Sequence, residues 1–185
     1  MPSESELMET AADRLPLSIS IQELVTDGGD HEFRELVALL NAATGRMHSM
    51  RRELAKALGV SVAEFSVLTA LMYLERKGNV RVRTVAEHLH IAAARVTTIV
   101  KRLAVSGWVI KTTDSRDSRA VSLRLTAEAQ DKLTAFGPLL CAVNDQWFAG
   151  MSRPELLIAS EFMRRLVRQF DSAMTKAKDM QGAMS

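Results

Sequence analysis

Apolar residues recur at helical spacing through most of the chain, in runs separated by turn signals. Over residues 31–58 they fall at steps of three and four, which predicts one long amphipathic helix that ends at Gly59. A second run, 61–76, is apolar on nearly every side and predicts a buried helix. Ser61 followed by Glu64 is the pattern of a capping box at its start.

The middle of the chain changes from helical spacing to alternation. A short strand is expected over 80–83, followed by a brief helix over 85–89 that Thr84 caps, and then by a helix over 92–106. Residues 108–113 and 120–125 predict two antiparallel strands around a polar loop. Two short helices followed at once by a hairpin make a winged helix-turn-helix.

Long helices return after Thr126, with a kink or break expected at Gly137-Pro138 and a last helix that begins near Ser152. The expected fold is therefore mainly α with a small β-hairpin wing. Five segments are predicted: an N-terminal arm, partly flexible, over 1–30; a long helix over 31–60; the winged helix-turn-helix over 61–126; C-terminal helices over 127–176; and a flexible tail over 177–185. Residues 19–26 of the arm either dock on a partner chain or belong to a plain disordered tail.

Composition places the chain among soluble globular proteins, with 47% apolar and 25% charged residues. There is no apolar run of about 18 residues, so no membrane span is expected. The N-terminus has no signal-peptide pattern and the chain has one cysteine, Cys141, so a cytoplasmic location is expected.

Charge is distributed unevenly, although the net charge is only +2. Residues 1–35 hold nine acids and two bases, and residues 76–124 hold eleven bases and three acids. A basic middle behind an acidic head indicates a polyanionic partner, such as DNA, for the middle segment.

The helix over 92–106 carries the side chains that a major groove requires. Val96, Ile99, Val100 and Leu103 fall on one face and are expected to pack inward. Short residues suit close approach to the bases, and longer donors reach base edges or phosphates. We expect the DNA contacts of this helix from Ala93, Ala94, Arg95, Thr97, Thr98, Lys101 and Arg102, with Arg95 and Thr98 favoured for base edges. The alternative is a solvated helix face.

The predicted hairpin has a charged tip, and an arginine at such a tip can enter the narrow minor groove of DNA. The alternative is a solvated acid-base turn. The candidate wing residues are Asp114, Ser115, Arg116, Ser118 and Arg119.

These motifs resemble the MarR family of winged-helix transcriptional regulators. The most specific sign is the run Asp-x-Arg-Asp-x-Arg followed by Leu-Thr, formed here by Asp114, Arg116, Asp117, Arg119, Leu125 and Thr126. SVAEFSVLTALMYL, TVAEHLHI and VTTIVKRLAVSGWV support it, and the resemblance covers about 32–172. It implies that Arg116 probes the groove, that Asp114 braces it, and that Arg119 supports the loop. Ala92 to Ala94 depart from the Pro-Ser type of cap that many members have.

The resemblance also implies a homodimer built from the first and the last two helices, and an inverted-repeat operator. It implies a repressor that a small effector, such as an aromatic carboxylate, releases from DNA. Arg46, His48 and Arg51 on the first helix are candidates for the effector's carboxylate, or else surface charges or intersubunit ion pairs.

Other classes of function have less support in the sequence. No phosphate loop, G-x-S-x-G or H-E-x-x-H motif occurs, so an enzyme is not expected, and no cofactor is implied. Cys141 has no neighbouring base to favour a redox-sensing thiolate, and His88 and His90 are poorly spaced for a metal site. A non-specific architectural winged-helix protein remains the main alternative.

Overall fold

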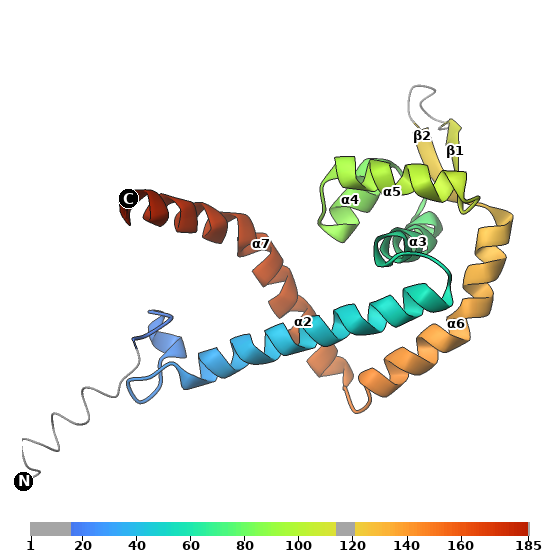
Figure 1. Ribbon diagram of the computed structural model, residues 1–185. Coiled ribbons are helices and arrows are strands. Elements are labelled where there is room, and N and C mark those ends of the chain that lie inside the picture. The colour runs from blue at the N-terminus through green and yellow to red at the C-terminus, as the bar shows by residue number, and fades with distance from the viewer. Residues whose placement is uncertain (1–15, 114–120, 185) are drawn as a thin grey trace, which may run out of the picture. The chain divides into compact units, whose positions relative to one another are not determined.

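The computed structural model describes residues 16–113 and 121–184, and it is mainly helical with one small hairpin (Figure 1). This confirms the predicted fold class. The elements are the 3-10 turn η1 (Gln22–Leu24), α2 (His31–Ala57), α3 (Val62–Leu74), the 3-10 turn η2 (Glu75–Lys77), α4 (Val82–Leu89), α5 (Ala93–Val105), β1 (Val109–Thr113), β2 (Val121–Leu125), α6 (Ala127–Trp147) and α7 (Arg153–Met184).

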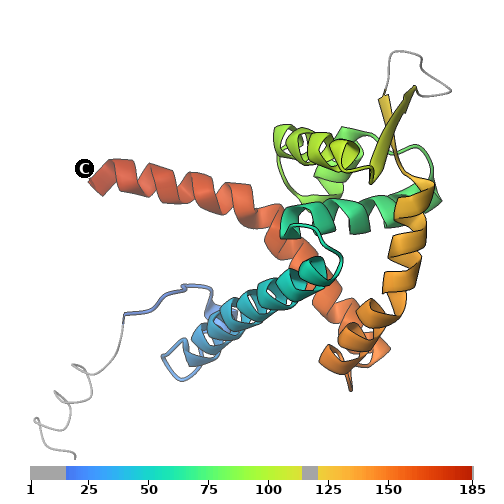
Figure 2. The same ribbon diagram turned by 45° about the vertical axis from the view of Figure 1, so that its right-hand side comes forward.

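The chain divides into two compact units, one that ends at Thr134 and one that begins at Ala135, so the boundary falls inside α6. The first unit contains the winged helix. There α3, α4, α5 and the hairpin lie together in both views (Figures 1 and 2). Their shared core consists of aliphatic side chains with almost no exposed surface, among them Leu68, Leu71, Val85, Val96, Val100, Leu103, Val109 and Leu123.

The two strands of the wing pair antiparallel, with Val109 opposite Leu125 and Thr113 opposite Val121. Val80 forms a single bridge on the other edge of β2, where Leu123 N donates to Val80 O over 2.7 Å. The strand predicted over 80–83 is therefore limited to this bridge, because the chain already enters α4 at Val82.

Two capping predictions have opposite outcomes. Ser61 and Glu64 form the predicted capping box of α3. The prediction that Thr84 caps the next helix is wrong, because α4 begins at Val82 and the N-cap position belongs to Arg81. The helix begins earlier than the capping motif suggested, and it buries Val85 in the core.

The two C-terminal helices are longer than the pattern suggested. α6 continues through Gly137-Pro138 without a break in the helix. α7 continues to Met184, so the boundary predicted after residue 176 lies inside a helix. The segment 177–184 has no proline, and its Ala, Lys, Met and Gln residues favour helix, whereas Asp179 and Gly182 do not.

Residues 16–30 form a hook on the start of α2. Asp30 is only 4% exposed, and its carboxylate accepts hydrogen bonds from Ser18 N and from Arg34 Nε, each over 2.6 Å. Arg34 also donates to Pro16 O over 2.6 Å. Arg34 first and then Ser18 hold the pKa of Asp30 far below its ordinary value. Part of the arm predicted as flexible is therefore tied to α2.

Within 16–113 and 121–184, no single helix is long and apolar enough to cross a membrane. Only α2 taken together with the stretch Val62–Lys77 passes that test, as a pair bent by 83°.

Candidate nucleic-acid interface

α5 is divided lengthwise into a buried and an exposed face. Val96, Ile99, Val100 and Leu103 are buried, as the spacing predicted. Of the seven candidate contact residues, Thr97 is half-buried and the other six, Ala93, Ala94, Arg95, Thr98, Lys101 and Arg102, are exposed. The structure therefore brings the predicted set together on the surface opposite the core, where it can meet a ligand as large as a duplex.

The turn between α4 and α5 fixes where this face begins. His90 caps the end of α4 in the left-handed conformation, with φ 52°, and reverses the chain into Ala92. Ala92 occupies the N-cap of α5 in an extended conformation and supplies no side-chain hydrogen bond, as expected from the alanine run. Nothing longer than a methyl group therefore projects where α5 starts.

The cations of α5 have no internal partner. Within the described part of the chain, the side chains of Arg95, Lys101 and Arg102 make no hydrogen bond or ion pair, and all three are exposed. Arg83 on α4 is 88% exposed and pairs with Glu87 over 2.8 Å. Exposed pairs of this kind contribute little to stability, so Arg83 can exchange Glu87 for a phosphate. In the sequence, Arg83 is one of the eleven bases of residues 76–124, and no motif distinguishes it from the others.

The wing is present as the strands β1 and β2. Its tip residues Asp114, Ser115, Arg116, Ser118 and Arg119 lie outside the described residues, so their proposed roles rest on the sequence. Lys111 on β1 and Arg124 on β2 are exposed cations on the described strands. They are opposite Leu123 and Ile110 in the register, so the two cations lie on opposite faces of the hairpin.

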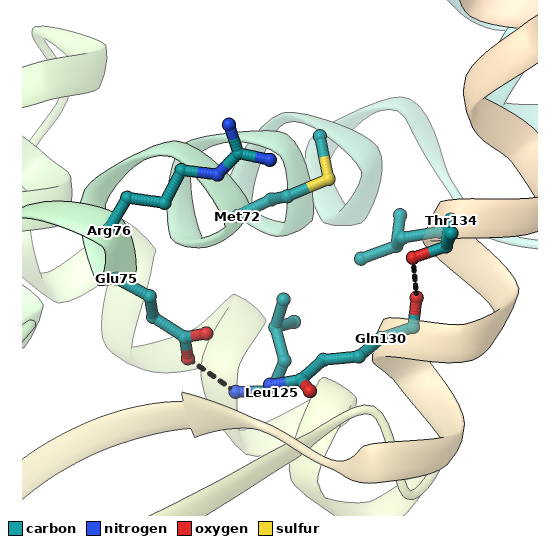
Figure 3. Close-up of a pocket in the computed structure, with 7 residues that line it drawn as sticks. Met72, Glu75, Arg76, Leu125, Gln130 and Thr134 are labelled. Atoms are coloured by element: carbon teal, nitrogen blue, oxygen red, sulfur yellow. Dashed lines mark hydrogen bonds between the residues drawn. The ribbon is translucent and has the colours of Figure 1, made fainter.

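A cavity of about 330 Å³ lies behind the wing, lined by Met72, Glu75, Arg76, Leu125, Gln130, Leu133 and Thr134 (Figure 3). Glu75 reaches from the end of α3 to the end of β2, where its carboxylate accepts a hydrogen bond from Leu125 N over 2.6 Å. Arg76 extends away from Glu75, and its side chain has no partner in the described residues. The cavity thus combines apolar walls with one unpaired guanidinium.

None of the three effector candidates on α2 lines this cavity. Arg46 and His48 are exposed, whereas Arg51 is half-buried and donates to Ser66 Oγ over 3.1 Å. Its guanidinium also lies 5.8 Å from the centroid of the Phe65 ring. The cavity could not be predicted from the sequence. Glu75 and Leu125, which meet at its edge, are 50 positions apart, and no local pattern links them.

The alternative sensor residues Cys141 and His88 belong to helices other than α5. Cys141 is exposed on α6. His88 stacks on Tyr73 with ring centroids 5.3 Å apart. Over the described ranges there is no group of three His, Cys, Asp or Glu residues that could hold a metal ion.

Residues 58–120 match the model of the MarR family. The winged-helix part of this chain belongs to the MarR family. The HTH-type transcriptional repressor MdtR of Bacillus subtilis (strain 168) is 24% identical over 110 residues, which is 60% of this chain and 69% of that protein. The matched segment is accordingly a DNA-binding winged helix of the type found in MarR-family transcription regulators.

Solved structures of the family share the fold. The transcription regulator MarR from Oenococcus oeni PSU-1 has a TM-score of 0.64 at 21% identity, over 72% of this chain and 98% of that one. CouR from Rhodococcus jostii RHA1, solved bound to p-coumaroyl-CoA, has a TM-score of 0.62 at 20% identity, over 70% of this chain and 89% of that one. Each alignment leaves over a quarter of this chain uncovered.

Proposed function

We propose that this MarR-family regulator acts as a homodimeric, sequence-specific repressor in the cytoplasm, and that a small effector releases it from an inverted-repeat operator. The observation that carries the proposal is the exposed face of α5. It presents Arg95, Lys101 and Arg102 without internal partners, while the opposite face is fixed in the core. A rigid helix with unpaired cations and short side chains fits the major groove, where it can form hydrogen bonds to base edges.

The long helices outside the winged helix supply the proposed dimer interface. In the first unit, α2 exposes Leu36, Val37, Leu39 and Met47. In the second unit, α7 exposes a larger apolar set that includes Leu157, Ile158, Val167 and Phe170. Exposed apolar side chains that recur along a helix in this number are uncommon on monomers, so each helix is a candidate for an interface. A two-fold dimer places its recognition helices about one helical turn, ~10 bp, apart on DNA.

The cavity behind the wing is the proposed effector site. Arg76 can bind a carboxylate, while Met72, Leu125 and Leu133 accommodate an apolar or aromatic body. This location replaces Arg51, whose guanidinium is already engaged by Ser66 and Phe65. Among the related structures, CouR was solved bound to p-coumaroyl-CoA, an aromatic thioester, which supports the aromatic body of the ligand but not its free carboxylate.

Affinity selection of genomic DNA fragments, followed by mobility-shift titration of the selected fragments, tests the proposal. A specific repressor should select an inverted repeat and resist competition by bulk DNA at fixed salt. Equal competition by bulk DNA would show an architectural DNA-binding protein instead. Sedimentation of a monomer at micromolar concentration would exclude the dimer.

A melting-temperature screen with benzoic and phenolic acids tests the effector. A ligand that binds only the folded protein raises the melting temperature, and the shift grows with the logarithm of the ligand concentration above Kd. The shift should disappear in Arg76→Ala and persist in Arg46→Ala, which removes an equally exposed arginine from α2. If the shift persists in Arg76→Ala and disappears in Arg46→Ala, the effector binds at α2 and not in the cavity.

A further inference from the structure

The outermost line of α5 is formed mainly by methyl groups. Ala94, Thr98, Lys101 and Val105 follow one another at steps of four, three and four, so they lie in one row along the helix. All four are exposed, and Val105 is 90% exposed. The buried residues Val96, Val100 and Leu103 lie on the opposite side.

The hydroxyl protons of the two threonines are already in use. Thr97 Oγ1 donates to Ala93 O over 3.0 Å, and Thr98 Oγ1 donates to Ala94 O over 3.1 Å. These bonds run back one helical turn and lock each side chain in one rotamer. What Thr98 offers to a ligand is therefore its methyl group and the remaining lone pair of Oγ1, rather than an O–H donor.

From this face we infer that α5 recognises thymine through its C5-methyl group, with Ala94 and Thr98 as the specificity-determining residues. The inference rests on the proposed sequence-specific DNA binding. Among the four bases only thymine projects a methyl group into the major groove, and apolar side chains contact it directly. The methyl groups of Ala94, Thr98 and Val105, which lie in one row with Lys101, can therefore contact thymine methyl groups in the major groove.

The flanking residues complete the readout. Arg95 and Arg102 are seven positions apart and lie on the same flank of the row, where they can donate to guanine or to phosphates. The predicted half-site thus contains thymines opposite the Ala94 and Thr98 row, with a guanine beside them on the side of Arg95.

Replacing thymine by deoxyuridine tests this inference, because the exchange removes only the C5-methyl group and keeps every hydrogen-bonding group of the base. Each contacted methyl should contribute about one buried carbon, so binding should weaken about fourfold per replaced thymine within the half-site. Replacement outside the protected region should change nothing. Specific binding with equal affinity for the thymine and deoxyuridine operators would overturn the inference and leave the proposed function intact.

Two substitutions at one position separate the methyl group from the hydroxyl group. Thr98→Val keeps a methyl and the β-branched shape but removes Oγ1, so it should retain the preference for thymine over deoxyuridine. Thr98→Ser keeps the hydroxyl and removes the methyl, so it should lose that preference at one position. Thr175 also donates to a carbonyl one turn back, Asp171 O at 3.0 Å on α7, and Thr175→Ser is the matched control.

The pattern of outcomes is decisive. Loss of the preference in Thr98→Val and its retention in Thr98→Ser would show readout through the hydroxyl oxygen and overturn the inference. Failure of the wild-type chain to prefer any fragment over bulk DNA would remove the proposed function and the inference together.

Discussion

Thr126 and Gly107 are 19 residues apart in the chain, and Thr126 Oγ1 donates a hydrogen bond to Gly107 O over 2.8 Å. The same oxygen accepts from Ala129 N over 3.1 Å and so caps the start of α6. Thr126 N donates to Trp108 O over 3.1 Å. One residue therefore joins the end of the recognition helix, the base of the wing and the first turn of α6.

Substitution of Thr126 by valine should destabilise the first unit by about 1 kcal/mol, because it removes an N-terminal cap of α6 and the bond to Gly107. Urea unfolding at fixed protein concentration measures the free energy of unfolding. Thr126→Ser retains the hydroxyl group and should lie close to wild type. A loss in Thr126→Ser without a loss in Thr126→Val would show that packing of the methyl group, and not the cap, stabilises this junction.

Glu75→Ala should lower the free energy of unfolding by about 1–3 kcal/mol, because it leaves the partly buried Leu125 N–H without an acceptor. Glu75→Gln preserves an acceptor oxygen and should lose less. Urea unfolding ranks the two variants. If Glu75→Ala and Glu75→Gln lower the free energy of unfolding equally, the 2.6 Å hydrogen bond from Leu125 N to Glu75 does not stabilise the end of β2.

Arg95→Ala and Arg116→Ala should weaken DNA binding in different ways. Arg95→Ala should cost about 1–3 kcal/mol on the operator and little on bulk DNA, because it removes a base contact. Arg116→Ala should weaken binding to all sequences and reduce the salt slope by about 1. Mobility-shift titrations over a range of salt distinguish them, with Lys178→Ala on α7 as control. Wild-type binding by Arg116→Ala would contradict the wing assignment.

The hook at residues 16–30 should loosen in acid. Because Arg34 and Ser18 depress the pKa of Asp30, the stabilisation is present above the ordinary pKa of an aspartate, about 4, and is lost as the pH falls below it. Hydrogen exchange at Ser18 N, corrected for its intrinsic rate, should accelerate over that range. Asp30→Asn should show fast exchange already at pH 7, and Asp27→Asn, which changes an exposed aspartate of the same turn, should not.

The local sequence pattern was sufficient to predict several features of the winged helix. The spacing of Val96, Ile99, Val100 and Leu103 assigned the buried face of α5, and Ser61 with Glu64 placed the start of α3. These features are encoded within one or two helical turns, where side-chain periodicity and backbone hydrogen bonding act together. The same approach failed at Thr84, because burial of Val85 and an earlier helix start overrode a capping motif.

The sequence by itself determined the order of the main helices and the hairpin, the inward face of α5 and the basic character of the middle segment. Only the tertiary structure decided which polar groups meet. Glu75 with Leu125, Thr126 with Gly107 and Ser18 with Asp30 are contacts across 50, 19 and 12 positions. They exist because a buried or constrained N–H or carboxylate must find a partner in the folded chain, and that partner is selected by packing and not by the residues next to it.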